Sequence, residues 1–294
     1  MKIESFPRKL FLFRNNLCMF AQTQNELHNM KHMSILAVSL LALVACTPEK
    51  KQEADYSQYV NPMIGTDFTG NTYPGAQVPF GMVQLSPDNG LPGWDRISGY
   101  FYPDTTIAGF SHTHLSGTGA GDLYDISFMP VTRPYKEAPA PLGIYSTFSH
   151  NDEAASAGYY RVLLKDYNIN VELTATERCG IQRYTFPEAE ASVFLNLKKA
   201  MNWDFTLDSK IEVVDSTTIR GYRLSQGWSP LQHVYFETRF SKPFVACHMD
   251  TTSIVTKEKG WIGTAYVARF DFNTKKDEEI LVTTGISGVS MEGA

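Results

Sequence analysis

Two histidines in a glycine-rich segment are the first residues whose types and spacing could do chemistry. Residues 109–122 read GFSHTHLSGTGAGD, which places His112 and His114 two positions apart and Asp122 at the end. In an extended strand the two imidazoles would point to the same face, where they could ligate a metal, hold a sugar or anchor a domain interface. Alternatively, they satisfy the buried backbone of a loop. A single nearby carboxylate leaves a metal site incomplete, and the glycines lack the lysine-containing pattern of a phosphate-binding loop.

A tryptophan beside a carboxylate forms a second candidate site upstream. Trp94 and Asp95 follow Gly93 in a stretch rich in glycine and proline. The face of an indole packs on the apolar C–H face of a pyranose, and a carboxylate accepts hydrogen bonds from neighbouring hydroxyls, so the pair is typical of a sugar site. The same residues could instead close the end of a β-sandwich, with Asp95 capping a turn. Local chemistry leaves both interpretations open.

Hydrolysis of a glycoside would need more than these residues supply. It usually requires two carboxyl groups, ~6.5–9.5 Å apart in an inverting enzyme. The spacing of the aspartates in this region picks out no pair; the candidates by position are Asp88, Asp95, Asp104, Asp122 and Asp125. The GxSxG elbow of a serine hydrolase is also missing from the sequence. The segment therefore indicates a binding surface more than a catalytic centre.

The elements that must position these loops are predicted to be β-strands. Apolar residues recur at every second position in 169–176, 234–240 and 266–272, as in strands with one buried face. Further short β-branched or aromatic runs, separated by turn residues, are 124–131, 159–165, 181–186, 193–197, 218–224, 245–249 and 280–286. No long amphipathic helix is expected. The predicted fold is all-β, a single large antiparallel β-sandwich with its binding loops in 61–122.

Composition and cysteine usage limit the partners and cofactors. The chain has 294 residues and a net charge of -5, which provides no basic surface, so we expect no nucleic-acid partner. None of the four cysteines has metal-ligand spacing; they are Cys18, Cys46, Cys179 and Cys247. Cys179 and Cys247 lie in strand-like runs, where they could fill the core or form a disulfide.

The N-terminal region predicts export and a lipid anchor. Residues 34–45, SILAVSLLALVA, are apolar but too short for the ~20 residues that span a bilayer. They follow a short basic start and precede Cys46, as in a signal peptide, and 43–46 resembles a bacterial lipobox with Cys46 as the lipidation site. We expect a signal over 30–46, a tether over 47–57 and the sandwich over 58–294, anchored to the bacterial cell envelope. Residues 1–29 are expected to be an upstream extension from an early start assignment.

Several motifs, taken in order, resemble glycoside hydrolase family 92. They are YVNPMIGT at 59–66, GNTYPGA at 70–76, VPFGM at 78–82, SGY at 98–100 and GFSHTHLSGTG at 109–119, and the end, ISGVSMEGA at 286–294, looks like the family's domain junction. The resemblance implies a calcium-dependent, inverting exo-α-mannosidase whose N-terminal domain is a mutarotase-like supersandwich. It implies Trp94 as the main sugar-binding residue, with Asp95, His112 and His114 as further substrate-binding candidates.

The resemblance also implies that catalysis belongs to another domain. In this family a C-terminal (α/α)6 barrel carries the general acid, the general base and the Ca²⁺ ligands, and the sequence to Ala294 does not contain it. We therefore expect no catalytic residue and no metal ligand in this chain, and Ca²⁺ only in the complete enzyme. The missing part is expected to reflect a gene break, a frameshift or a partial record.

The expected function is that of a substrate-binding and scaffold domain in an enzyme that trims glycans, inactive alone. Its expected partners are mannose-containing glycans, the (α/α)6 domain or the product of a neighbouring reading frame, and a membrane through the lipid anchor. One alternative is a free-standing carbohydrate-binding surface lipoprotein. Another is a structural surface protein whose aromatic residues serve only the core.

Overall fold

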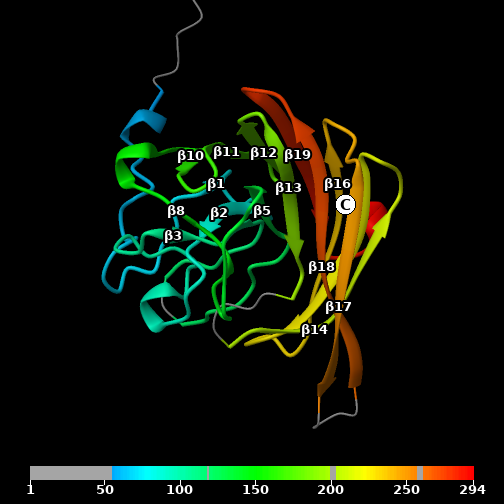
Figure 1. The fold of residues 1–294 in the computed structure, drawn as a ribbon. Helices are drawn as coiled ribbons and strands as arrows, with labels where there is room; N and C mark the ends of the chain where they lie inside the picture. The colour runs from blue at the N-terminus through cyan, green and yellow to red at the C-terminus, as the bar shows by residue number, and fades with distance from the viewer. Residues whose placement is uncertain (1–54, 118, 199–202, 257–260) are drawn as a thin grey trace, which may run out of the picture. The chain divides into compact units, whose positions relative to one another are not determined.

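The computed structural model describes residues 55–294 except 118, 199–202 and 257–260. The predicted signal, Cys46 and the upstream extension lie outside these residues and stay predictions. The unit from Asp55 to Ala294 is built mainly from strands (Figure 1). Its described helices are short 3-10 turns: η1 (Ser57–Tyr59), η2 (Trp94–Arg96), η3 (His150–Asp152) and η4 (Met291–Gly293). No helix in the described residues is long and apolar enough to cross a membrane.

One layer is a seven-stranded sheet in the order β1-β2-β4-β5-β13-β18-β17. Its neighbouring strands pair antiparallel. The strands are β1 (Ala76–Gln77), β2 (Gln84–Asp88), β4 (Gly109–Ser111), β5 (Ser127–Thr132), β13 (Ala189–Asn196), β17 (Ala246–Thr256) and β18 (Trp261–Thr274). The central strands of this layer come from the middle and the end of the chain, so distant segments lie side by side (Figure 1).

The other layer is an eight-stranded sheet in the order β14-β15-β16-β19-β12-β11-β10-β9. Its strands are β9 (Glu153–Ser156), β10 (Tyr159–Leu164), β11 (Ile169–Ala175), β12 (Cys179–Phe186), β14 (Phe205–Val213), β15 (Thr218–Gln226), β16 (Gln232–Phe240) and β19 (Glu278–Ser287). Two small strand pairs complete the described part: β3 (Thr106–Ile107) with β8 (Ser146–Thr147), and β6 (Glu137–Ala138) with β7 (Gly143–Ile144). These pairs are also antiparallel.

The two sheets pack face to face through side chains that alternate along each strand. Every second residue of β11, from Ile169 to Ala175, is buried, and β16 has the same alternation. The ring of Phe240 on β16 lies 5.2 Å from that of Phe270 and 5.6 Å from that of Phe272, between centroids. Both partners belong to β18, so these rings join the sheets, and each buried Phe contributes roughly 1.5–3 kcal/mol. The predicted all-β antiparallel sandwich is confirmed.

Strand boundaries differ from the predictions where the backbone departs from the strand pattern. The predicted run 124–131 begins as a strand only at Ser127, because Tyr124 and Ile126 have φ angles of 62° and 56°, which no strand adopts. The strand β14 was not predicted. A register shift between Thr206 and Asp208 interrupts the two-residue alternation there, as a β-bulge does.

The two described cysteines are free thiols. Cys179 begins β12 and Cys247 lies on β17, in different sheets. Both are half-buried, and Cys247 packs against the hydrophobic core. Burial raises the pKa of the Cys247 thiol. Of the two alternatives that the sequence left open, the unpaired one holds in this structure.

Candidate functional site

Trp94 lies on the short helix η2, with its indole turned outward. The preceding Gly93 has a φ of 150°, which only glycine adopts readily. Arg96 fixes the helix from the other side: its Nε and Nη2 donate to the two carboxylate oxygens of Asp104 over 2.6 and 2.5 Å. Trp94 keeps 53% of its surface exposed, and Asp95 is half-buried beside it.

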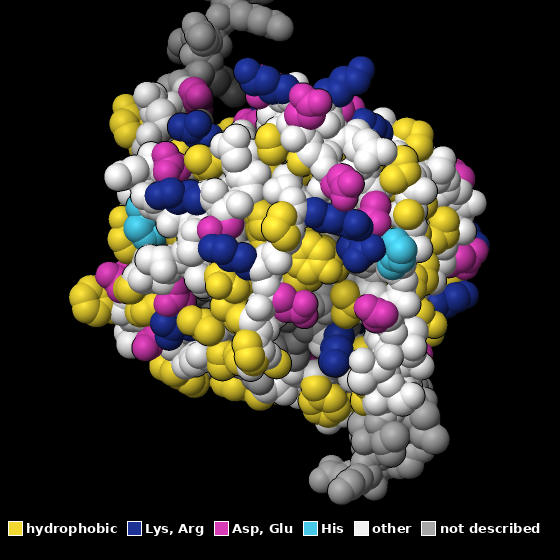
Figure 2. All heavy atoms as spheres, viewed as in Figure 1, with side chains coloured by type: hydrophobic (Ala, Val, Ile, Leu, Met, Phe, Trp, Pro, Cys, Tyr) yellow, Lys and Arg dark blue, Asp and Glu magenta, His cyan; other side chains and the backbone are white. Residues whose placement is uncertain are grey.

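A second indole stacks on Trp94. The rings of Trp94 and Trp203 lie 6.4 Å apart between centroids, with 29° between their planes. Trp203 is 44% exposed, so the pair presents aromatic surface to solvent instead of closing the core. In the view of Figure 2, hydrophobic side chains gather at the lower left of the molecule, over the region where Figure 1 places η2. Such an apolar surface on a soluble fold is typical of a binding site.

A third tryptophan, Trp228, lies at the same end of the eight-stranded sheet as Trp203. β14 and β15 pair with Phe205 opposite Gln226. Trp203 lies two residues before the first of these, and Trp228 two residues after the second. Trp228 is 77% exposed. We call Trp94, Trp203 and Trp228 the tryptophan rim; it contains three of the four tryptophans of the chain.

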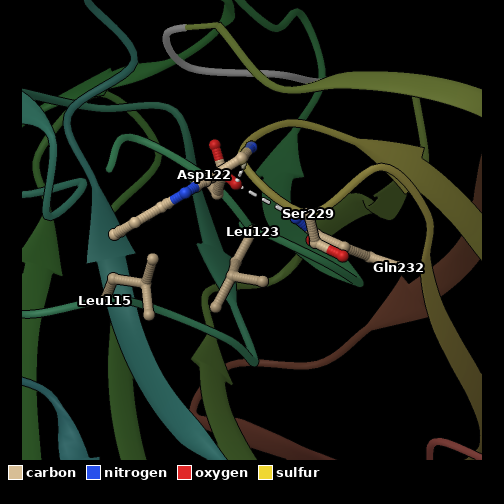
Figure 3. Close-up of a pocket in the computed structure, with 6 residues that line it drawn as sticks. Leu115, Asp122, Leu123, Ser229 and Gln232 are labelled. Carbon is tan, nitrogen blue, oxygen red and sulfur yellow. Dashed lines mark hydrogen bonds between the residues drawn. The ribbon is translucent and has the colours of Figure 1, made fainter. Parts of the chain in front are cut away.

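An open pocket of about 490 Å³ lies beside Trp228 (Figure 3). The buried carboxylate of Asp122 holds one wall: its Oδ2 accepts hydrogen bonds from the backbone N–H of Trp228 over 2.6 Å and from Nε2 of Gln232 over 3.1 Å. A side chain at Gly227 would collide with this carboxylate, so only glycine fits there. The complete lining is Leu115, Asp122, Leu123, Trp228, Ser229 and Gln232.

A buried charge network supports the rim from below. The fully buried Arg223 on β15 donates to Asp125 over 2.6 Å and to Asp204 over 2.9 Å, and its Nη1 reaches the carbonyl of Leu123 over 3.3 Å. Burial raises the pKa of Asp204 to about 6, although the charge of Arg223 opposes this shift. Because Asp204 adjoins Trp203 and Leu123 lines the pocket, the network fixes both parts of the site.

The two predicted histidines are buried away from solvent. The strand β4 ends at Ser111, so a strand repeat does not set the orientation of His112 and His114. Nδ1 of His114 lies 2.7 Å from the carbonyl oxygen of Gln84, and its Nε2 lies 2.9 Å from Oδ1 of Asp88. Both contacts are to the strand β2, one to its backbone and one to a carboxylate side chain. A role of His114 in sugar binding stays a prediction.

His112 is enclosed on its own. Its Nδ1 donates to the carbonyl oxygen of Ile126 over 2.7 Å, and its Nε2 has no hydrogen-bond partner among the described residues. Burial lowers the pKa of His112 to about 4, so the ring is neutral at neutral pH. A sugar role for His112 also stays a prediction.

Three of the aspartates considered for acid–base chemistry are engaged within the fold. Asp88 meets His114, Asp104 meets Arg96, and Asp125 meets Arg223. Within the described ranges, no group of three or more His, Cys, Asp or Glu side chains could hold a metal ion.

Sequence reasoning missed Trp203, Trp228, Gln232 and Arg223. The two tryptophans carried a usable signal, because each stands next to an aspartate, a serine or a glycine in a loop, as Trp94 does. Arg223 carried no usable signal, because in the sequence it is one charged residue in an alternating strand. Its complete burial depends on two aspartates that lie 98 and 19 residues away.

The fold is that of a known class of domain. Residues 59–287 match the Glycosyl hydrolase family 92 N-terminal domain. The chain therefore belongs to glycoside hydrolase family 92, through the N-terminal domain of that family. This confirms the resemblance found in the sequence motifs.

Individual solved structures and one fungal protein also resemble the chain. A family GH92 α-mannosidase from Bacteroides thetaiotaomicron, solved in complex with mannoimidazole, is 39% identical with a TM-score of 0.73, over 81% of this chain and 33% of that one. An inverting GH92 mannosidase from the same species is 25% identical with a TM-score of 0.64, over 82% and 33%. An uncharacterized secreted glycosidase of Arthroderma benhamiae is 26% identical over 55% of this chain and 21% of that protein. The chain thus spans about a third of the solved mannosidases.

Proposed function

We propose that the chain serves as the substrate-binding and scaffold domain of an exo-α-mannosidase that trims mannose-containing glycans. The observation that carries the proposal is the half-exposed stack of Trp94 on Trp203. It is supported by the 39% identity to a mannosidase solved with mannoimidazole. The indole of Trp94 packs on the C–H face of a mannose unit, and Asp95 accepts hydrogen bonds from its hydroxyls.

The rigidity of η2 favours this use. Arg96 makes a two-pronged ion pair with Asp104, and its guanidinium lies 4.7 Å from the ring centre of Phe101. Because these contacts fix the helix before a sugar arrives, little conformational entropy is lost on binding. Trp203 holds the indole of Trp94 in place from the other side. The sugar then meets a platform that is already formed.

In the proposal, the hydrolytic groups come from outside this chain. An inverting reaction uses one carboxylic acid to protonate the leaving oxygen and one carboxylate to activate water. Asp88, Asp104 and Asp125 are instead held in structural contacts, and Asp95 is proposed to bind the sugar. We propose that a helical catalytic domain supplies both groups and the Ca²⁺ ligands, that its action is inverting, and that the chain alone does not hydrolyse mannosides.

An exposed apolar segment favours such a partner domain. Six large hydrophobic side chains near the start of the described residues are more than half exposed: Tyr56, Tyr59, Val60, Ile64, Phe68 and Phe80. Soluble proteins rarely leave a patch of this kind uncovered. We propose that the catalytic domain covers it.

We also propose export and anchoring through Cys46 to the bacterial cell envelope. The similarity to a secreted fungal glycosidase supports export. The anchor rests on the sequence of residues 43–46.

Calorimetric titration of the full chain with α-mannobiose tests the sugar site. We expect binding that weakens about tenfold in Trp94→Ala, as for an aromatic contact at the centre of a site, and that Trp94→Phe partly restores. Tyr59→Ala is the matched control, since Tyr59 is an exposed aromatic residue that lies outside the rim. Binding that is absent, or unchanged in Trp94→Ala, would refute the proposed sugar site. Release of mannose by the chain alone would refute its inactivity.

A further inference from the structure

We propose that the pocket beside Trp228 is a second sugar subsite, which binds another neutral pyranose of the glycan held at Trp94. This inference rests on the proposed function. It assigns a ligand to Trp228, Ser229 and Gln232, which the sequence motifs did not single out. It also implies that a glycan of two or more units is bound better than a single mannose.

The lining has the composition that a pyranose requires. Trp228 supplies an aromatic face that is 77% exposed, and Leu115 and Leu123 form an apolar wall next to it (Figure 3). Ser229 and Gln232 add a hydroxyl and an amide to the lining. Each also bonds within the chain: the Ser229 hydroxyl to the carbonyl of Leu231, and the Gln232 amide to Asp122 and Ser225. A volume of about 490 Å³ falls within the range of small-molecule sites, and such sites combine an apolar lining with few polar groups.

Asp122 acts as the positioning residue of this subsite. Its Oδ2 binds both the backbone of Trp228 and the amide of Gln232, and so fixes the aromatic face relative to the polar side. The Oδ1 atom of Asp122 is buried and has no hydrogen-bond partner among the residues described. Burying a carboxylate with one oxygen unsatisfied is costly. The two hydrogen bonds that Oδ2 accepts offset part of this cost and order the loop that carries Trp228.

The charges behind the pocket favour a neutral ligand. Two carboxylates, those of Asp125 and Asp204, pair with a single cation, Arg223, and a third, that of Asp122, lies close enough to Asp204 to raise its pKa. The local excess of negative charge opposes a sialic acid or a sulfated sugar, because like charges repel more strongly where water is excluded. A neutral hexose has no such penalty. The ligand class is therefore a neutral pyranose such as mannose.

The indole N–H signals of the tryptophans in a ¹H–¹⁵N spectrum of the full chain test this assignment. The variants Trp94→Phe, Trp203→Phe and Trp228→Phe each remove one signal and so assign it. We expect methyl α-mannoside to shift the Trp94 signal, α-mannotriose to shift those of both Trp94 and Trp228, and sialyllactose to leave the Trp228 signal in place. By calorimetry, Trp228→Ala should weaken α-mannotriose about tenfold and methyl α-mannoside less than twofold.

The outcomes separate this inference from the proposed function. A Trp94 signal that moves while Trp228 stays unchanged with α-mannotriose overturns the second subsite alone. A Trp228 signal that moves while Trp94 stays unchanged overturns the role of Trp94 and leaves a sugar site at Trp228. Two unchanged signals overturn both. An equal response of Trp228 to sialyllactose overturns the assignment of a neutral ligand.

Discussion

The buried His112 gives a prediction that separates a structural histidine from a sugar ligand. Its pKa is lowered from 6.5 to about 4 by burial. Between these values the unfolded chain binds a proton at this position and the folded chain does not. The contribution of His112 to stability is therefore fully present above pH 6.5 and is lost as the pH falls towards 4.

The size of this loss follows from the two pKa values. Proton binding by the unfolded state alone lowers the free energy of unfolding by roughly 2 kcal/mol between pH 7 and pH 5. His112→Asn removes the titrating group and keeps a donor near the carbonyl of Ile126. The smaller side chain leaves a cavity beside Phe128, whose ring lies 5.9 Å from that of His112 between centroids. We expect the variant to be about 1–2 kcal/mol less stable at pH 7.

Urea unfolding followed by tryptophan fluorescence at pH 5, 6 and 7 measures the effect. The free energy of unfolding of the native chain minus that of His112→Asn should fall by roughly 2 kcal/mol from pH 7 to pH 5, so that the advantage of the native chain disappears or reverses. All other titrating groups, including Asp204, cancel in that difference. His233→Asn, at an exposed histidine, controls for the loss of an imidazole as such. A difference that stays constant with pH would refute a buried, neutral His112, and intact mannoside binding in the variant would exclude it as a sugar ligand.

Three further changes test the support of the site. Arg223→Met leaves two buried carboxylates unpaired and should lower the free energy of unfolding by about 3–5 kcal/mol in urea, while Arg239→Met, at an exposed ion pair, should change it little. Gly227→Ala drives a methyl group against Asp122 and should destabilise by about 1–3 kcal/mol, with a loss of the Trp228 indole response; an unchanged melting curve would contradict the contact. Trp203→Ala removes the partner of Trp94 and should weaken α-mannobiose several-fold in calorimetry, with almost no change in stability.

The strands of the sandwich were predictable because they obey a local rule. Along β11 and β16 each residue's burial follows from its parity in the sequence, and no knowledge of the partner strand is needed. The rule fails where the backbone leaves the strand region. The left-handed φ values of Tyr124 and Ile126 and the bulge at 206–208 depend on tertiary contacts that a single sequence does not display.

The site was predictable only in part, for the same physical reason. Trp94 stood out because its neighbours suit sugar chemistry. The contribution of Trp203 and Trp228 depends on the pairing of β14 with β15. The strand β14 was not predicted, because its bulge interrupts the alternating pattern. The sequence thus contained the aromatic residues of the rim but not the register that brings two of them to one end of the sheet.

The buried network around Arg223 explains how this end keeps its geometry. An ion pair removed from water is a weak source of net stability, because the desolvation of the charges offsets their attraction. The contribution of this network is to hold separate segments of the chain in position. Arg223 lies on β15, whereas its partners lie in the loop that leads into β5 and directly before β14. One guanidinium therefore ties three separate segments together, and two of them carry Trp203 and a wall of the pocket. An apolar replacement could fill the same volume, but it would have no directional contact with which to hold those segments in register.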